Sequence, residues 1–294
     1  MPIEIECVTD NNSLVGEGAF WDHRNGLLWW VDIPAGLIHC LDSDGKNQTW
    51  VWDEAVGCLA VREAGGLLLA TRSGFHFFDP ETGHREAIAD PEAGSPESRF
   101  NDGTTDPRGR FWAGSMSESR DKQKHGRFYR LDPDGLVTTH FDRFFMTNGL
   151  AFSAQGERLY FSDSDPRVRT LWCCDYDPDT GEAGVPWPFF DTRGVPGRPD
   201  GGTVDAEGCY WMAGVGGWQL LRLTADGQID RIIEMPVERP TKPMFGGPDL
   251  DVLFVTSSAT GITPGTESDQ PQAGGLFALT GLDINGVPQT RFAG

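Results

Sequence analysis

The stretch RFNDGTTDPRGRFWAG, residues 99–114, contains the unit that recurs along this chain and decides its fold. Its polar residue Asn101 comes eight residues before Gly109, the last residue of a D-x-x-G turn, and the strand-like segment RFWAG follows that turn. Corresponding glycines stand at positions 26, 65, 156 and 208. The resulting period of roughly 40 to 50 residues is typical of β-propeller blades.

The segments between these turns are short, apolar or aromatic, and separated by Gly, Pro, Asp and Asn. No long helical period is present, and 38 glycines with 20 prolines would interrupt helices too often. A sixth, degenerate copy covers residues 249–281. We therefore predict an all-β, six-bladed β-propeller with a central metal site, forming a single domain over residues 1–294. A β-sandwich with similar turns is the alternative.

A propeller must close on itself, because an open array would leave strand edges exposed. We predict that the N-terminal segment IEIEC, residues 3–7, completes the sheet of the last blade.

Charge and composition exclude several classes of partner. The formal net charge is −20, which would repel nucleic acid and anionic membrane surfaces. No apolar run is long enough to span a bilayer, and the acidic start MPIEIECVTD has no signal-peptide pattern, so we expect a cytoplasmic protein. The six cysteines contain no C-x-x-C motif, and we expect them to be reduced and packed in strands.

Polar residues recur at one phase of the repeat. Besides Asn101, Asn148 and Asp200 lie eight residues before their turn glycines, and Glu17 lies nine before its own. Equivalent positions of blades arranged around an axis point to the same place, so these side chains should converge. Each of them alone could be an ordinary turn residue, as in the Asn-Gly pair of MTNGLAF.

The remaining two blades have different residues at this phase, namely 57–58 in blade two and, by our assignment, 245–247 in blade six. A purely structural turn should repeat the same residue in every blade, whereas a functional site breaks the symmetry. Carboxylate and amide oxygens favour hard divalent cations such as Ca²⁺, Mg²⁺ or Mn²⁺. The sequence lacks paired histidines at metal spacing, a G-x-S-x-G motif, a P-loop and a complete G-x-G-x-x-G.

Further candidates surround this set. Arg99 precedes Asn101 by two residues and could either bind substrate oxygens or pair with one of the many acids. The connections at residues 115–128 and 260–275 are long and polar, and either could be a solvated loop or a lid over the centre.

An ordered set of short motifs resembles the SMP-30/gluconolactonase/regucalcin family over almost the whole chain. The motifs are GEG (16–18), RFNDG (99–103), AGSM (113–116), TNGL (147–150), PDGG (199–202), TKPMFGGPD (241–249) and AGG (273–275). The first motif is followed by Ala19, where the family usually has proline.

The resemblance implies metal-dependent hydrolysis of a small-molecule sugar lactone, such as glucono-, xylono- or arabinonolactone, to the aldonic acid. It implies Glu17, Asn148 and Asp200 as metal ligands, with Asp200 also as general base. It implies Arg99, Asn101 and Glu118 as substrate-binding residues, with Ser119 as the alternative to Glu118 because the motif can be aligned at either position. Ca²⁺ is the favoured cation, and Zn²⁺, Mn²⁺ and Fe²⁺ are possible. A phosphotriesterase-like hydrolase and a non-catalytic calcium-binding propeller remain as alternatives.

Overall fold

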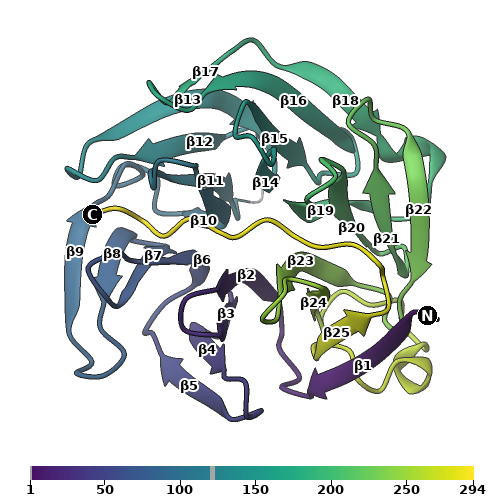
Figure 1. Cartoon of the computed structure of the whole chain (residues 1–294). Coiled ribbons are helices and arrows are strands. Elements are labelled where there is room, and N and C mark those ends of the chain that lie inside the picture. Colours follow the sequence, from purple (N-terminus) through teal and green to yellow (C-terminus); the bar gives the residue numbers. More distant parts are fainter. Residues whose placement is uncertain (1, 120–122) are drawn as a thin grey trace.

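The strands of this computed structural model, which describes residues 2–119 and 123–294, form six sheets arranged as blades around a central axis (Figure 1). From the axis outward, the first three blades have the following strands. Blade 1 contains β2 (Gly16–Asp22), β3 (Leu27–Asp32), β4 (Leu37–Leu41) and β5 (Asn47–Val51). Blade 2 contains β6 (Val56–Val61), β7 (Leu67–Thr71), β8 (Gly74–Phe78) and β9 (Arg85–Ala89). Blade 3 contains β10 (Ser98–Thr105), β11 (Phe111–Ser117), β12 (Gly126–Leu131) and β13 (Val137–Phe144).

The other three blades follow the same order. Blade 4 contains β14 (Thr147–Phe152), β15 (Arg158–Asp163), β16 (Thr170–Asp177), β17 (Glu182–Ala183) and β18 (Trp187–Asp191), the last two both pairing with β16. Blade 5 contains β19 (Arg198–Val204), β20 (Tyr210–Val215), β21 (Gln219–Leu223) and β22 (Ile229–Glu234). Blade 6 contains β23 (Pro240–Gly246), β24 (Val252–Ser257), β25 (Leu276–Thr280) and β1 (Glu4–Thr9). The helical segments among the described residues are the 3₁₀ turns η1 (Thr192–Gly194) and η2 (Glu267–Asp269).

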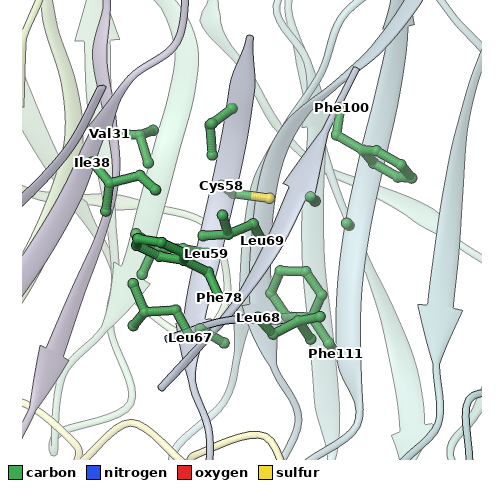
Figure 2. Packing of buried hydrophobic residues seen from close by; sticks show 14 of the residues in the cluster. Val31, Ile38, Cys58, Leu59, Leu67, Leu68, Leu69, Phe78, Phe100 and Phe111 are labelled. Atoms are coloured by element: carbon green, nitrogen blue, oxygen red, sulfur yellow. The ribbon is translucent and has the colours of Figure 1, made fainter. Parts of the chain in front are cut away.

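Burial changes from the axis to the rim of each blade. The innermost strand β2 is buried along its whole length, whereas the outermost strands β5 and β9 are largely exposed. Apolar side chains of successive blades pack face to face, as in the cluster around Cys58, Leu69 and Phe100 (Figure 2). A fully buried Leu or Phe contributes roughly 1.5–3 kcal/mol by leaving water. All six cysteines are free and five of them are buried, which confirms the prediction except that Cys7 is half-buried and Cys209 directly precedes β20 and does not lie in a strand.

The ring closes through its N-terminal strand, as predicted. Strand β1 pairs antiparallel with β25, with Glu4 opposite Thr280 and Cys7 opposite Phe277. The six-bladed, all-β architecture is therefore confirmed. No helix in the described part of the chain is both long and apolar enough to cross a membrane.

The two ends of the axis differ. Each innermost strand begins at one face, which we call the strand-start face, and ends at the opposite face, which we call the turn face because the turns to the second strands lie there. A C-terminal strap, residues 285–294, crosses the turn face (Figure 1). Its backbone bonds Ala206, Val61 and Gly109 of three blades, and Arg291 forms a 2.6 Å ion pair with Asp22. A cavity of about 100 Å³ lies between this strap and the inner strands. The strap therefore covers the axis on the turn face.

Candidate active site

Every innermost strand has an irregularity in its pairing near the strand-start face. The register shifts fall at Glu17/Phe20, Val56/Cys58, Phe100/Asp102, Asn148/Ala151, Pro199/Gly202 and Pro240/Pro243. A β-bulge leaves one residue unpaired and turns its side chain away from the normal alternation. The residues at the recurring phase of the sequence therefore lie in a ring of bulges, one in each blade. These bulges turn the polar side chains toward the axis.

Glycines allow the bulges to form at two of these positions. Gly18 and Gly149 directly follow Glu17 and Asn148, and they have left-handed φ angles of 62° and 69°. A side chain at Gly149 would also collide with the hydroxyls of Tyr210 and Ser162, at 2.8 and 2.9 Å from its Cβ. Glycine is thus required here both by the backbone conformation and by the close approach of blades 4 and 5.

The three predicted metal ligands are buried. Glu17 is 3% exposed, Asn148 2% and Asp200 8%. The Nδ2 atom of Asn148 donates to Ser164 Oγ at 2.8 Å, and Ser164 Oγ in turn donates to the carbonyl of Pro199, next to Asp200. This chain of bonds fixes the Asn148 amide against the strand that carries Asp200.

The electrostatics of this set favour a cation. Burial, followed by the charges of Asp200 and Asp102, raises the pKa of Glu17 well above its ordinary value. Burial also raises the pKa of Asp200 to about 7, against the opposing charges of Arg239 and Arg198. Two neighbouring buried carboxyls whose pKa is raised form a site that a nearby positive charge would stabilise in its ionised form.

One atom supplies the most direct test of whether the residues fit a metal ion. Asn148 Oδ1 is buried and has no hydrogen-bond partner among the described residues. Buried polar atoms are nearly always paired, so an unpaired carbonyl oxygen beside two carboxylates is suited to hold a hard cation. The described residues contain no group of three His, Cys, Asp or Glu at metal-binding distance, and the set here is two carboxylates and one amide. Its chemistry fits Ca²⁺ and similar ions.

The predicted substrate-binding residues also come together. Arg99 Nη1 donates to Asn101 Oδ1 at 2.8 Å, and Arg99 Nε donates to Glu118 Oε1 at 2.9 Å. Asn101 Nδ2 donates to the carbonyl of Thr147 at 2.8 Å, so both ends of this amide are engaged. Burial opposes the ionisation of Glu118, but hydrogen bonds from Arg72 and Arg99 lower the pKa of this carboxyl below its ordinary value.

Blade six differs from our sequence assignment. Its bulge lies at Thr241–Lys242 and not at residues 245–247. The turn residue equivalent to the glycines is Leu250, which has a left-handed φ of 57° and donates its N–H to Gly247 O as the glycines do in other turns. Lys242 stands eight residues before Leu250, at the same phase as Asn101. The sequence signal was present, but a leucine in a glycine position concealed it.

Lys242 forms an ion pair with Asp102, a second residue that the sequence did not single out. Its side chain is 1% exposed, and its Nζ bonds Asp102 Oδ1 at 2.9 Å and Leu150 O at 3.3 Å. Asp102 is fully buried and accepts the N–H of Leu150 at 2.8 Å. This ion pair joins blade 6 to blade 3 near the axis, and the charge of Lys242 opposes the rise in the pKa of Glu17.

The two lid candidates have different outcomes. Of the connection at residues 115–128, positions 120–122 lie outside the described residues. The connection at residues 260–275 contacts the strand-start face, where Arg239 Nη1 donates to the carbonyl of Gly261 at 3.1 Å. A lid function for either segment stays a prediction.

Six blades around a centre that gathers two carboxylates, an unpaired amide oxygen and an arginine–asparagine–glutamate cluster define a β-propeller with a candidate cation-binding active site. Residues 15–259 match the family described as SMP-30/Gluconolactonase/LRE-like region, and the chain belongs to this family. The resemblance inferred from the motifs is thereby confirmed.

Known relatives match over nearly the full length. The chain is 38% identical over 291 residues to a 6-deoxy-6-sulfogluconolactonase of Pseudomonas putida, covering 99% of both chains. It is 34% identical to the regucalcin of Xenopus laevis, again over 99% of both. It also superposes with a TM-score of 0.93, at 30% identity, on a crystal structure described as a calcium-binding protein, regucalcin, from Agrobacterium tumefaciens, covering 99% of this chain and 98% of that one.

Proposed function

We propose that this protein hydrolyses sugar lactones to aldonic acids with the help of one divalent cation held by Glu17, Asn148 and Asp200. The observation that carries the proposal is the unpaired Asn148 Oδ1 beside two buried carboxylates. The name of the Pseudomonas putida relative supports the substrate class, and the calcium-binding description of the Agrobacterium tumefaciens structure supports Ca²⁺ as the cation.

The bound cation supplies positive charge that polarises a carbonyl oxygen and acidifies water. Asp200 accepts a proton from the attacking water, whose oxygen forms a bond to the lactone carbonyl carbon. The bond between this carbon and the ring oxygen then breaks, and the ring oxygen takes up the proton held by Asp200 to give the hydroxy acid. Arg99 and Asn101, joined at 2.8 Å, offer donors to substrate oxygens, while Glu118 can accept from sugar hydroxyls.

The deciding experiment is proton release from a panel of neutral aldonolactones by chelator-treated protein, before and after each divalent cation is added. Spontaneous ring opening is subtracted, and a phosphotriester is included in the panel. We expect cation-dependent turnover of at least one lactone. Turnover of the phosphotriester alone, or of no substrate with any cation, would contradict the proposal.

Variants separate the role of Asp200 from a general loss of carboxylate charge. Asp200→Asn should reduce kcat by roughly 100-fold or more, the usual range for a lost general base. Asp53→Asn is the matched control, because Asp53 is an exposed acid that pairs with Arg85 on the rim. Wild-type turnover by Asp200→Asn would refute the assignment of the base.

A further inference from the structure

Two arginines flank Asp200 at the strand-start face, and the mechanism above does not use them. Arg198 is the first residue of β19, two residues before Asp200, and Arg239 directly precedes β23 in the next blade. The strands β19 and β23 are in contact, and a Cβ at Gly201 would lie 2.7 Å from the carbonyl of Thr241. Both guanidinium groups therefore belong to neighbouring strand ends beside the candidate cation site.

Both arginines are anchored by backbone oxygens. Arg198 Nη1 donates to the carbonyl of Ser164 at 3.2 Å, and Ser164 is the residue that orients Asn148. Arg239 Nη1 donates to the carbonyl of Gly261 at 3.1 Å, and the N–H of Ser258 bonds Arg239 O at 3.0 Å. Neutral carbonyl partners position these side chains without cancelling their charge.

Arg198 and Arg239 differ from the arginines on the opposite side of the strand-start face in how their charge is balanced. Arg72 and Arg99 share the carboxylate of Glu118 in two ion pairs. Neither Arg198 nor Arg239, by contrast, has a carboxylate within ion-pair distance in the described part of the chain. In a protein of net charge −20, two adjacent cationic side chains without an acidic group at ion-pair distance are unexpected, although Asp200 and Glu238 lie near enough to act on Arg239 as charges.

Arg239 has a buried donor without a partner among the described residues. Its Nε is buried and makes no hydrogen bond to any described residue. An unpaired buried donor costs about 1–3 kcal/mol, more for a charged group, unless a ligand or water satisfies it. The charges also influence one another, since burial and the charge of Arg198 lower the pKa of Arg239, while the charges of Asp200 and Glu238 oppose this decrease. A cation held by Asp200 would offset the charge of this carboxylate, so the two arginines would face less negative charge.

We propose that Arg198 and Arg239 form a subsite for an anionic substituent of the lactone, a sulfonate or phosphate group carried on the sugar carbon away from the ring carbonyl. Guanidinium groups are suited to such groups because their planar donors match two oxygens at once. The inference rests on the proposed lactonase function and extends it, because it assigns the protein to charged sugar lactones in preference to neutral ones.

The test compares kcat/KM for glucono-1,5-lactone with that for the same lactone carrying phosphate or sulfonate at carbon 6, in the cation-loaded protein. We expect the charged substrates to be preferred, and the preference to decrease with added salt. Arg198→Gln and Arg239→Gln should each reduce the ratio of charged to neutral kcat/KM about tenfold or more. Arg24→Gln, which removes an exposed arginine paired with Glu63, should leave the ratio unchanged.

A second measurement does not depend on turnover. Calorimetry of the chelator-treated protein with 6-phosphogluconate should show binding that both subsite variants weaken and Arg24→Gln does not. A wild-type ratio of one or below, or a ratio unaffected by both subsite variants, would overturn the subsite while leaving the lactonase function intact. Absence of all lactone turnover with intact 6-phosphogluconate binding would instead contradict the proposed function alone. Comparing the phosphate and sulfonate substrates identifies which anion the subsite prefers.

Discussion

Replacing Lys242 by methionine tests the electrostatic arrangement at the centre of the propeller. Lys242 Nζ lies 2.9 Å from Asp102 Oδ1, and the two side chains are 1% and 0% exposed. Near this pair are the buried carboxyls of Glu17 and Asp200, both with a raised pKa. Methionine retains most of the length of the lysine chain and removes only its charge and its donors. The substitution therefore leaves Asp102 buried without its cation.

The expected cost follows from the burial of the pair. Removing one partner of a buried ion pair typically destabilises a protein by about 3–5 kcal/mol, because the remaining charge is uncompensated. Unfolding entropy near ~2.1 cal/mol/K per residue gives about 0.6 kcal/mol/K for the 294 residues of this chain. Lys242→Met should therefore lower the Tm of the chelator-treated protein by about 5–8 °C.

Calorimetric scans at one fixed rate, with chelator present, supply the assay. Lys46→Met is the control, because Lys46 is an exposed lysine in the turn between β4 and β5. The double variant Lys242→Met/Asp102→Asn removes both charges and should be more stable than Lys242→Met alone. A Tm loss for Lys242→Met no larger than that of the control would refute the reasoning. So would a double variant that is less stable than either single one.

Three further predictions concern the ligands, the protonation of the site and the packing of blades 4 and 5. Ser164→Ala should weaken cation binding about tenfold, measured by calorimetry, because Ser164 Oγ orients the Asn148 amide at 2.8 Å; unchanged affinity would remove Asn148 from the ligand set. Metal-free protein should become more stable as the pH falls from about 8 to about 5, since burial raises the pKa of Asp200 to about 7 and the folded state then binds this proton more tightly than the unfolded state. The gain in Tm from added Ca²⁺ should shrink over the same range, and a metal-free Tm that falls with the pH would contradict the assignment. Gly202→Ala should destabilise by about 1–3 kcal/mol, measured by urea unfolding, because its Cβ would lie 2.0 Å from the buried Tyr210 hydroxyl, whereas Gly94→Ala, whose φ is not positive and whose Cβ meets no atom within 4 Å, serves as the control.

Much of the architecture could be predicted because each blade repeats the same local chemistry. The turn glycines and the strands after them predicted six blades, and the need to close the ring predicted that the N-terminal segment completes the last blade. The common phase of Glu17, Asn101, Asn148 and Asp200 predicted their convergence, since repeats related by rotation bring equivalent bulges to one axis. The roles of these residues and the single-domain extent of the chain stay predictions.

Other residues of the site could not be predicted from the repeat. Lys242 was missed because Leu250 adopts a left-handed conformation that glycine normally occupies, so the phase of blade six was misassigned. Asp102 follows Asn101 in the sequence, but only the fold shows that it meets a lysine 140 positions away. Arg198 and Arg239 lie in different blades, and their proximity depends on the packing of β19 against β23.

The pairing of β1 with β25 has a consequence for how the protein is made. Glu4 leaves the ribosome 276 residues ahead of its partner Thr280 (280 − 4). At a synthesis rate of roughly 5–20 residues per second, the first strand waits about 14–55 s for its partner. During this interval its edge can pair with other nascent chains, a hazard that charged side chains reduce. Glu4, Glu6 and Asp10 supply such charges on and beside this strand before it takes its place in the finished ring.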